Sequence, residues 1–316
     1  MTDSATPWQR NKHVVLIVNP ASHNSLKEKH RDQIKEWLLE NGWMAAWRDT
    51  QAAGEATHIA AEVARSGVPL VLVCGGDGTL NEVINGLAGS ETTVGIIPTG
   101  TVNLWARELG VKRKNPLAAV EQALTGERRR IDLGRAGDRY FLSMASYGID
   151  AAVTAGVSHR LKGVVGAAAY AIASFREGLR YRSKEYTLDL DGERRKMRVV
   201  MVIASNTREY AGITQITPEA IVNDGFLDVR IFEGLGRRNM AMHALRVLLG
   251  LHKRAKKVHF RRVRQLVIRG QPPLPLQLDG DHAPDLPAEV TCVPGALWVA
   301  VPSGFTSPLF HLQPDP

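Results

Sequence analysis

Four short apolar runs alternate with helix-like segments in the first part of the chain, and no other feature limits the fold as strongly. Uninterrupted runs of this kind are typical of strands in a parallel sheet that is covered on both faces. They occupy residues 14–18, 44–47, 70–74 and 94–97. Helical periodicity followed by glycine marks residues 26–41 and 54–66 between them. The pattern predicts a wound α/β lobe that begins β-α-β-α-β.

Beyond about residue 130 the apolar period changes to two, which is typical of strands with one face on a core. Tyr186, Leu188 and Leu190 alternate with polar residues, and residues 227–231 repeat the pattern. Asp191-Gly192 predicts a hairpin turn after the first of these strands. Further strands are expected at 199–203, 265–268, 274–278 and 297–301, with one helix at 163–179. The second lobe is therefore predicted to be an antiparallel β-sandwich.

The length of 316 residues is enough for two lobes, and the expected fold class is α/β followed by β. A composition with 44% hydrophobic and 23% charged residues excludes collagen-like, coiled-coil and wholly disordered chains. The expected parts are an N-terminal tail (1–12), an α/β domain (13–130), a β-sandwich domain (131–301) and a C-terminal tail (302–316). The last part either packs back on the first domain or stays loose.

Cysteine usage and hydropathy favour a cytosolic chain with at most a peripheral contact to membranes. Cys74 and Cys292 lack metal-ligand spacing, which argues against a zinc site and a disulfide framework. The first 13 residues are polar and have no apolar segment like that of a secretory signal. The longest weakly polar stretch, 163–175, is shorter than the ~20 residues that a membrane-spanning helix needs.

Three glycines in four residues follow the third apolar run and precede a helical segment, in Gly75-Gly76-Asp77-Gly78-Thr79. Glycine lets backbone N–H groups approach a phosphate closely, and a helix N-terminus adds partial positive charge. Bare phosphate would repel Asp77, so this carboxylate implies an intervening metal ion or a transferable proton. The alternative is a tight strand-to-helix turn that binds no ligand.

A second loop, Pro98-Thr99-Gly100-Thr101-Val102-Asn103, follows the next apolar run. In a wound sheet it should lie beside the first loop, at the carboxyl ends of adjacent strands, where ligands bind. The sequence contains neither the Walker A pattern nor a complete G-x-G-x-x-G. The common P-loop and dinucleotide sites therefore lose support.

These loops resemble those of the diacylglycerol kinase catalytic-domain family, which includes bacterial lipid kinases and sphingosine and ceramide kinases. The resemblance covers about residues 13–301. Its motifs are Gly75-Gly76-Asp77-Gly78-Thr79 with Asn81-Glu82, Pro98-x-Gly100-Thr101-x-Asn103 with Ala106-Arg107, Ser146-Tyr147-Gly148-Ile149-Asp150, Pro218-x-Ala220 through Asp224-Gly225-Phe226-Leu227-Asp228, and Leu278-Asp279-Gly280. The resemblance implies a nucleotide-binding α/β domain, a β-sandwich domain for the acceptor, ATP and Mg2+ as cofactors, and a lipid hydroxyl as phosphate acceptor.

The resemblance also implies roles for individual residues. Asp77 would hold Mg2+, and the carboxylate of Asp224, with the main-chain oxygens of Ile221 and Phe226, would form a divalent-ion site that organises the second domain. An Asp-Gly turn before a strand is otherwise commonplace. The family's glycine shortly after Asn19-Pro20 is absent here. The implied nucleotide contacts are Asn19, Thr50, Gly75, Gly76, Asp77, Gly78, Thr79, Leu80, Asn81, Gly100, Thr101 and Asn103.

The implied catalytic base lies in the turn Asp279-Gly280-Asp281, where bacterial members of the family have Asp-Gly-Glu. Asp281 is one methylene shorter than that glutamate, whereas proton abstraction needs a contact of roughly 3 Å, directly or through one water. A working aspartate base, a slow enzyme and a binding protein without turnover all fit this difference. Asp191-Gly192-Glu193 matches the motif literally, but it lies in a predicted hairpin, so we do not expect Glu193 to act.

Between residues 235 and 278 the chain has eleven basic residues and no acidic one, against a net charge of +8 for the whole protein. A basic amphipathic segment in a lipid kinase predicts peripheral docking on an anionic membrane, through residues 237–269. A solvated charged face is the alternative. Nucleic acid is not an expected partner, because no binding module or aromatic interleaving is present. The apolar helical stripe of this segment consists of Ala241, Leu245, Leu248 and Leu249, widened by Met242, Val247 and Leu251.

The leading hypothesis is an ATP- and Mg2+-dependent kinase that transfers the γ-phosphate to the hydroxyl of diacylglycerol or a related membrane lipid, in the cytoplasm at the inner face of the membrane. One alternative is an NAD kinase-like small-molecule kinase, since that family has a similar Gly-Gly-Asp-Gly-Thr loop. The other is a non-catalytic peripheral membrane protein that binds nucleotide or lipid. Asn103 and Arg107 favour the lipid kinase. The oligomeric state is left open, a homodimer included.

Overall fold

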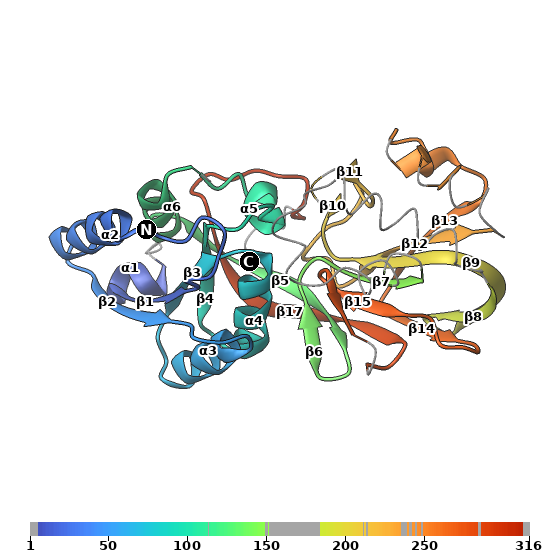
Figure 1. Ribbon diagram of the computed structural model, residues 1–316, viewed down its shortest axis with the longest axis horizontal. Coiled ribbons are helices and arrows are strands. Elements are labelled where there is room, and N and C mark those ends of the chain that lie inside the picture. Colours follow the sequence, from blue (N-terminus) through green and yellow to red (C-terminus); the bar gives the residue numbers. More distant parts are fainter. Residues whose placement is uncertain are drawn as a thin grey trace, which may run out of the picture. The chain divides into compact units, whose positions relative to one another are not determined.

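The computed structural model divides the chain into two compact units, residues 1–131 with 295–316 and residues 132–294 (Figure 1). It describes residues 6–112, 114–148, 151, 184–210, 212, 214–234, 239, 242–243, 245–247, 249–283 and 286–311. The helix expected at 163–179 and the motif residues Ile149 and Asp150 lie outside the described residues. Each unit is considered by itself below.

Unit 1 is built on a parallel sheet with the strand order β2-β1-β3-β4, as the apolar runs predict. Its strands are β1 (His13–Val18), β2 (Met44–Asp49), β3 (Leu70–Gly75) and β4 (Thr93–Pro98), followed in the sheet by the end of β17 (Glu289–Val301). Its helices are α1 (Pro7–Asn11), α2 (Glu28–Glu40), α3 (Glu55–Arg65), α4 (Asp77–Leu87), α5 (Leu104–Glu108) and α6 (Pro116–Leu124). The wound α/β lobe is confirmed.

Burial explains most of these elements and corrects one expectation. Every residue of β3 and β4 is buried, which accounts for their unbroken apolar sequences. Helix α3 buries Ala56, Ile59, Ala60 and Val63, which follow helical spacing. Strand β2 was expected to be covered on both faces, and this is wrong: it pairs only with β1, at the edge of the sheet, and Met44 is 61% exposed.

The chain enters unit 2 in β5 (Glu127–Ala136) and returns in β17. The last residues of β17, 295–301, group with unit 1. The reason is that Trp298 and Val299 pair with Thr93 and Val94 of β4. The described part of the C-terminal tail also packs on unit 1, where Arg129 donates a hydrogen bond to the carbonyl oxygen of Phe305.

Unit 2 is an antiparallel assembly with the strand order β16-β15-β7-β9-β8-β14, in which β12 and β13 extend from β9. Strand β9 sends Val202 and Ala204 into one apolar core and Val200 and Ile203 into another. The predicted β-sandwich is thus confirmed. Its strands are β6 (Arg139–Phe141), β7 (Met144–Gly148), β8 (Lys184–Leu190), β9 (Glu193–Ser205), β10 (Glu209–Tyr210), β11 (Thr214–Gln215), β12 (Leu227–Glu233), β13 (Val258–Val263), β14 (Gln265–Arg269), β15 (Leu276–Leu278) and β16 (Asp281–His282), with a 3-10 turn η1 (His252–Arg254).

Strand β12 departs from the expected pattern of one buried face. Leu227, Val229 and Ile231 are buried as expected, but Asp228 and Arg230 on the other face are also only 1% and 3% exposed. Arg230 is neutralised there by Glu219, at 2.6 Å, and stacks on the ring of Phe260. Alternation along a strand shows which side chains share a face, but it cannot show that a second layer covers the polar face.

No helix within the described ranges is both long enough and apolar enough to cross a bilayer.

Candidate functional site

Two loops of unit 1 meet at the carboxyl ends of neighbouring strands. Strands β3 and β4 are parallel and in register, with Gly75 opposite Pro98, so the loops that follow them start side by side (Figure 1). The first loop is Gly76 alone, since α4 begins at Asp77. The second loop spans residues 99–103 and leads into α5. The sequence prediction that these two loops converge is confirmed.

The loops touch through the backbones of two glycines. A methyl group placed on Gly100 would lie 2.5 Å from Cα of Gly76 and 2.8 Å from Oδ1 of Asn103. A methyl group on Gly76 would lie 3.2 Å from Cα of Gly100. Real Cβ atoms do not approach backbone atoms at the shorter of these distances, so Gly100 is required for the two loops to pack.

Asp77 fastens the second loop to the first. Its Oδ2 accepts a hydrogen bond from the backbone N–H of Asn103 at 2.9 Å, and its Oδ1 accepts one from Leu104 at 2.7 Å. These N–H groups lie at the start of α5, so the carboxylate satisfies donors that a helix terminus leaves without partners. Asp77 therefore has a structural role that the sequence analysis missed, because its partners lie 26 and 27 residues away.

Asparagine side chains hold both loops in shape. Asn103 has a left-handed backbone, with φ of 53°. Its Nδ2 donates to the carbonyl oxygen of Gly100 at 2.7 Å, and its Oδ1 accepts from the N–H of Gly100 at 3.1 Å. Asn19, at the end of β1, donates to Oγ1 of Thr79 at 2.9 Å. With the bonds of Asp77, these hydrogen bonds connect the segments that follow β1, β3 and β4.

The other residues of unit 1 that were predicted to contact the nucleotide differ in where they lie relative to the two loops. Thr50 is buried at the end of β2 and bonds to the backbone of Val18. Thr101 is exposed on the second loop. Leu80 is 2% exposed and its N–H already donates to Gly76, so it contributes packing at this site. Asn81 is buried one turn further along α4, beside Asn85.

The geometry suits an anion and is compatible with a divalent metal ion. Helix α4 starts with Gly76 as N-cap, without a side-chain hydrogen bond to the cap. An N-terminus of this kind, reached through glycine, favours phosphate. The Asp77 carboxylate accepts one backbone hydrogen bond on each oxygen, and a carboxylate oxygen has two lone pairs, so these bonds do not exclude Mg2+. An all-oxygen donor is what Mg2+ prefers.

In unit 2, the predicted metal residue Asp224 lies in a group of carboxylates. Its Oδ1 accepts from the N–H of Phe226 at 3.1 Å, and the N–H of Gly225 donates to Asp132. Arg262 bridges Asp224 and Asp228, at 3.4 and 3.5 Å. Asp228 belongs to the same sequence motif as Asp224, whereas Asp132 and Arg262 are partners that no local sequence signal indicates.

This group carries more negative than positive charge. Burial raises the pKa of Asp228 to about 6, although Arg262 opposes the shift. Oxygen donors with excess negative charge fit a divalent cation, and Asp224 with the carbonyls of Ile221 and Phe226 would supply them. Among the described residues, no cluster of three or more His, Cys, Asp or Glu side chains is arranged to hold a metal. Any ion here would thus need main-chain oxygens.

The two aspartates of the Asp279-Gly280-Asp281 turn differ in what surrounds them. Asp279 accepts three backbone N–H groups, from Leu142, Ser143 and Met144, at 2.7 to 2.8 Å. Asp281 begins β16, and its Oδ2 accepts from Nη2 of Arg139 at 3.0 Å. The Asp281 side chain is 36% exposed. Asp279 holds the turn, and Asp281 presents a carboxylate to solvent.

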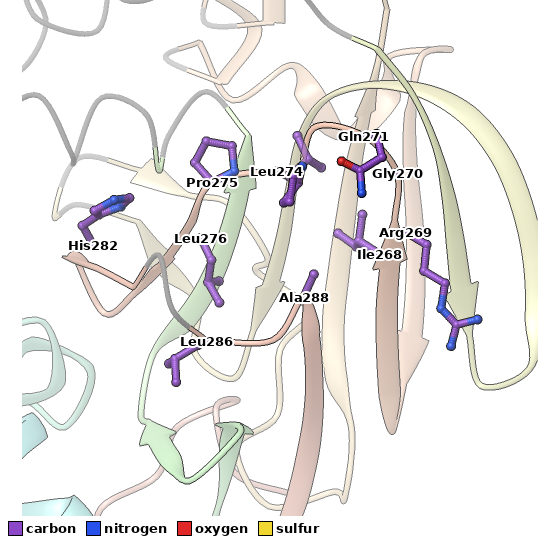
Figure 2. A pocket seen from close by; sticks show the side chains of 11 residues that line it. Ile268, Arg269, Gly270, Gln271, Leu274, Pro275, Leu276, His282, Leu286 and Ala288 are labelled. Carbon is purple, nitrogen blue, oxygen red and sulfur yellow. The ribbon is translucent and has the colours of Figure 1, made fainter.

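Unit 2 contains a mostly apolar cavity of about 620 Å3, whose lining includes His282 but not Asp281. Figure 2 shows the side chains that line it, with His282, the residue after Asp281, at one end of the set. The apolar lining includes Ile268, Leu274, Leu276 and Leu286. A volume of this size lies in the range of small-molecule sites. The sequence could not indicate the cavity, because apolar residues of this kind are equally needed for the core.

Two other residues are excluded from the site by their surroundings. Glu193, in the literal Asp-Gly-Glu, lies at the exposed hairpin between β8 and β9 and bonds to Arg195 of the same strand. Burial raises the pKa of the Cys74 thiol far above its usual range, so this cysteine is an inert part of the core.

Comparison with known proteins also divides the chain into two parts, with the second part ending at residue 301. Residues 13–136 match the family model of the diacylglycerol kinase catalytic domain, and residues 143–301 match that of the YegS C-terminal NAD kinase beta sandwich-like domain. The chain is 30% identical to a diacylglycerol kinase of Bacillus subtilis over 280 residues, which are 88% of this chain and 92% of the relative.

Two further comparisons agree. The chain is 34% identical over 256 residues to a diacylglycerol kinase of Mycobacterium tuberculosis, covering 79% of this chain and 82% of the relative. The crystal structure of a diacylglycerol kinase from Bacillus anthracis superimposes with a TM-score of 0.72 at 21% identity, covering 93% of this chain and 98% of that one. At that identity the structural likeness bears on the fold alone.

Proposed function

Because the chain belongs to the diacylglycerol kinase catalytic-domain family and is a lipid kinase, we propose that it transfers the γ-phosphate of ATP, bound with Mg2+, to the hydroxyl of diacylglycerol or a related membrane lipid. The observation that carries this proposal is the packing of the two glycine loops. Gly76 and Gly100 touch through their backbones, and Asp77 fixes the second loop by two hydrogen bonds.

Phosphoryl transfer depends mostly on alignment and on neutralisation of phosphate charge. The first turn of α4 supplies N–H groups and a dipole for the phosphates. The hydrogen bonds from Asn103 and Leu104 set the orientation of Asp77 before any ligand binds. Mg2+, when bound, would neutralise charge on the phosphate oxygens, and Asp77 is the residue that would hold it. Preorganisation of this kind lowers the cost of reaching the transition state.

Asp281 is the proposed general base. Its carboxylate is oriented by Arg139 and is accessible to an acceptor hydroxyl. The shorter side chain than the family's glutamate is compatible with the role if the hydroxyl comes within about 3 Å, directly or through a water. Asp279 supports this role, because its three backbone hydrogen bonds hold the turn that presents Asp281.

The apolar cavity beside the turn supports a lipid as the acceptor. His282, next to Asp281 in the chain, is one of its lining residues, and the lining is mostly apolar. An acyl chain in this cavity would place the polar end of the lipid near the turn. A soluble acceptor such as NAD would gain little from such a lining.

The proposal is tested by thin-layer analysis of products from labelled ATP with diacylglycerol, ceramide, a sphingoid base and NAD. We expect labelled phosphatidic acid, or another phosphorylated lipid, and no labelled NADP. Labelled NADP alone would favour the NAD kinase-like function. This alternative is tested because residues 143–301 match a domain described as NAD kinase beta sandwich-like. No product with any acceptor, from protein that binds ATP, would favour a non-catalytic role.

A further inference from the structure

Unit 2 carries an apolar ridge that is exposed in the part of the chain that the structure describes. Six large apolar side chains are about half exposed or more in the described residues, and four of them lie within ten residues of one another. They are Met242, Leu245, Leu249 and Leu251, which are 47%, 52%, 60% and 56% exposed. We call these four residues the ridge.

Met242, Leu245 and Leu249 of the ridge lie on the outward side of a helical segment, and Leu251 follows it before η1. Met242 and Leu245 are helical, and the N–H of Leu249 donates to the carbonyl oxygen of Leu245 at 3.0 Å, so the spacing is that of one helix face. The opposite face of this segment packs on the rest of unit 2. There His243 is buried against the ring of Phe232 and its Nε2 lies 2.9 Å from the carbonyl oxygen of Glu233.

Because the inner face of this helical segment is packed on unit 2, the segment cannot rotate to bury the ridge. Val247 belongs to the same core cluster as Phe232, one helical turn from His243. Figure 1 draws this segment in orange beside β12 and β13. The stripe that the sequence predicted is thus divided by the structure: Val247 packs inside, while Leu245 and Leu249 face out.

Exposed cations follow the ridge directly. Lys253, Lys256 and Lys257 come after Leu251, and all three are exposed. Within the described ranges none of these three lysines forms an ion pair. The nearby Arg262 and Arg264 differ, because Arg262 is held by Asp224 and Asp228 and Arg264 stacks on Phe226. Of these five cations, the three lysines next to the ridge are therefore the ones available to an anionic surface.

The exposed side chain of Leu39 in unit 1 has different neighbouring charges from those of the ridge. Leu39 is 78% exposed on α2 of unit 1, but it lies beside the exposed acidic residues Glu36 and Glu40. An anionic surface would repel that face. The ridge instead combines apolar side chains with cations and has no acidic residue between positions 235 and 278.

We propose that the ridge inserts into the interfacial region of an anionic bilayer while Lys253, Lys256 and Lys257 bind the lipid headgroups. An apolar face next to lysines is the pattern of an interfacial membrane helix. Cations attract anionic headgroups within a Debye length, and apolar side chains gain by leaving water. This inference concerns the partner surface and goes beyond the proposed phosphoryl transfer.

The test is co-sedimentation with vesicles of phosphatidylcholine containing 0 to about 40% phosphatidylglycerol, a range in which polybasic binding is expected to grow. Binding of the full chain should rise with phosphatidylglycerol and fall with salt. Replacement of all three lysines by glutamine should weaken binding about a hundredfold, since each cation contributes about fivefold. Leu245→Ser with Leu249→Ser should weaken it on the order of tenfold or more.

Matched variants separate the ridge from general charge and apolarity. Lys112, Lys114 and Lys184, which are also exposed, are changed together to glutamine to give the same change in net charge. Leu39→Ser with Met44→Ser removes the same kind of exposed apolar surface from unit 1. Both controls should bind vesicles as the unchanged chain does. Equal loss in the controls and the ridge variants, or no loss in the leucine double variant, would overturn the proposal.

The readout does not involve phosphorylation, so failure of the kinase proposal leaves this test valid. Sedimentation velocity without lipid checks the other occupant, a second copy of the chain. A dimer that dissociates in the Leu245→Ser, Leu249→Ser variant would show that the ridge is a protein interface and would overturn membrane docking.

Discussion

Asp77 of unit 1 and Asp281 of unit 2 are the two carboxylates to which the sequence assigns catalytic roles, and their surroundings differ. Both oxygens of Asp77 accept backbone hydrogen bonds that fasten one loop to another. Asp281 has one side-chain partner, Arg139, and a side chain that is 36% exposed. Asp77 therefore has a structural as well as a functional role, because it holds the second loop in place. Asp281 can be changed with little effect on the surrounding structure.

The comparison extends within the turn that contains Asp281. Asp279, two residues earlier, accepts three backbone N–H groups and resembles Asp77 in this respect. Variants of these three aspartates can therefore separate a catalytic role from a structural one. We expect a change of Asp281 to reduce activity alone, a change of Asp77 to reduce both activity and stability, and a change of Asp279 to reduce mainly stability.

The largest effect on turnover is expected for Asp281→Asn. Loss of a general base lowers kcat by about 10²- to 10⁴-fold. The thermal midpoint should stay close to that of the unchanged chain, because Asp281 is partly exposed and has a single side-chain partner. Initial rates with excess lipid and ATP give kcat. Glu193→Gln, in the exposed literal Asp-Gly-Glu hairpin, is the matched control and should leave kcat unchanged. Normal turnover by Asp281→Asn would show that another group takes the proton.

Asp77→Asn should lower both activity and stability. An amide keeps one acceptor oxygen, so one of the two backbone N–H groups loses its partner, at a cost of about 1–3 kcal/mol in the free energy of unfolding. Displacement of the second loop should reduce kcat/KM about a hundredfold or more. Urea unfolding and kinase assays measure the two effects. Asp32→Asn, an exposed change on α2, controls for charge, and unchanged stability with unchanged kcat/KM in Asp77→Asn would contradict the assigned role.

Asp279→Asn should affect stability more than chemistry. Three charge-assisted hydrogen bonds are weakened at once, and we expect a loss of about 2–3 kcal/mol in the free energy of unfolding. The effect on kcat should be smaller than that of Asp281→Asn, because Asp279 presents the base and does not take the proton. Urea unfolding checks this, with Asp138→Asn in the exposed neighbouring turn as the control. A kcat loss larger than that of Asp281→Asn would reverse the assignment of the two aspartates.

Much of the fold could be predicted from local pattern. The unbroken apolar runs located β1, β3 and β4, because strands covered on both faces have no polar positions. The meeting of the two glycine loops followed from the parallel order of the strands. Exposure of β2 and burial of Asp228 and Arg230 did not follow, since both depend on which elements lie next to a strand.

The parts of the candidate sites that escaped prediction are pairs that are distant in sequence. Arg139 and Asp281 are 142 residues apart, and Asp132 meets Gly225 across 93 residues. Periodicity reports only local geometry, so it cannot indicate such partners. It also cannot show on which side of a helix an apolar stripe faces outward, which is why the ridge of unit 2 emerged only from the structure.

The central claim is that the packed glycine loops of unit 1 bind the phosphates of ATP with Mg2+. Isothermal titration of ATP and Mg2+ into the unchanged chain and into Gly100→Ala tests it most directly, since the added methyl group would lie 2.5 Å from Cα of Gly76. We expect saturable binding by the unchanged chain and its loss in a variant that still melts cooperatively. Absence of binding to the folded unchanged chain, or equal binding by both proteins, would contradict the claim.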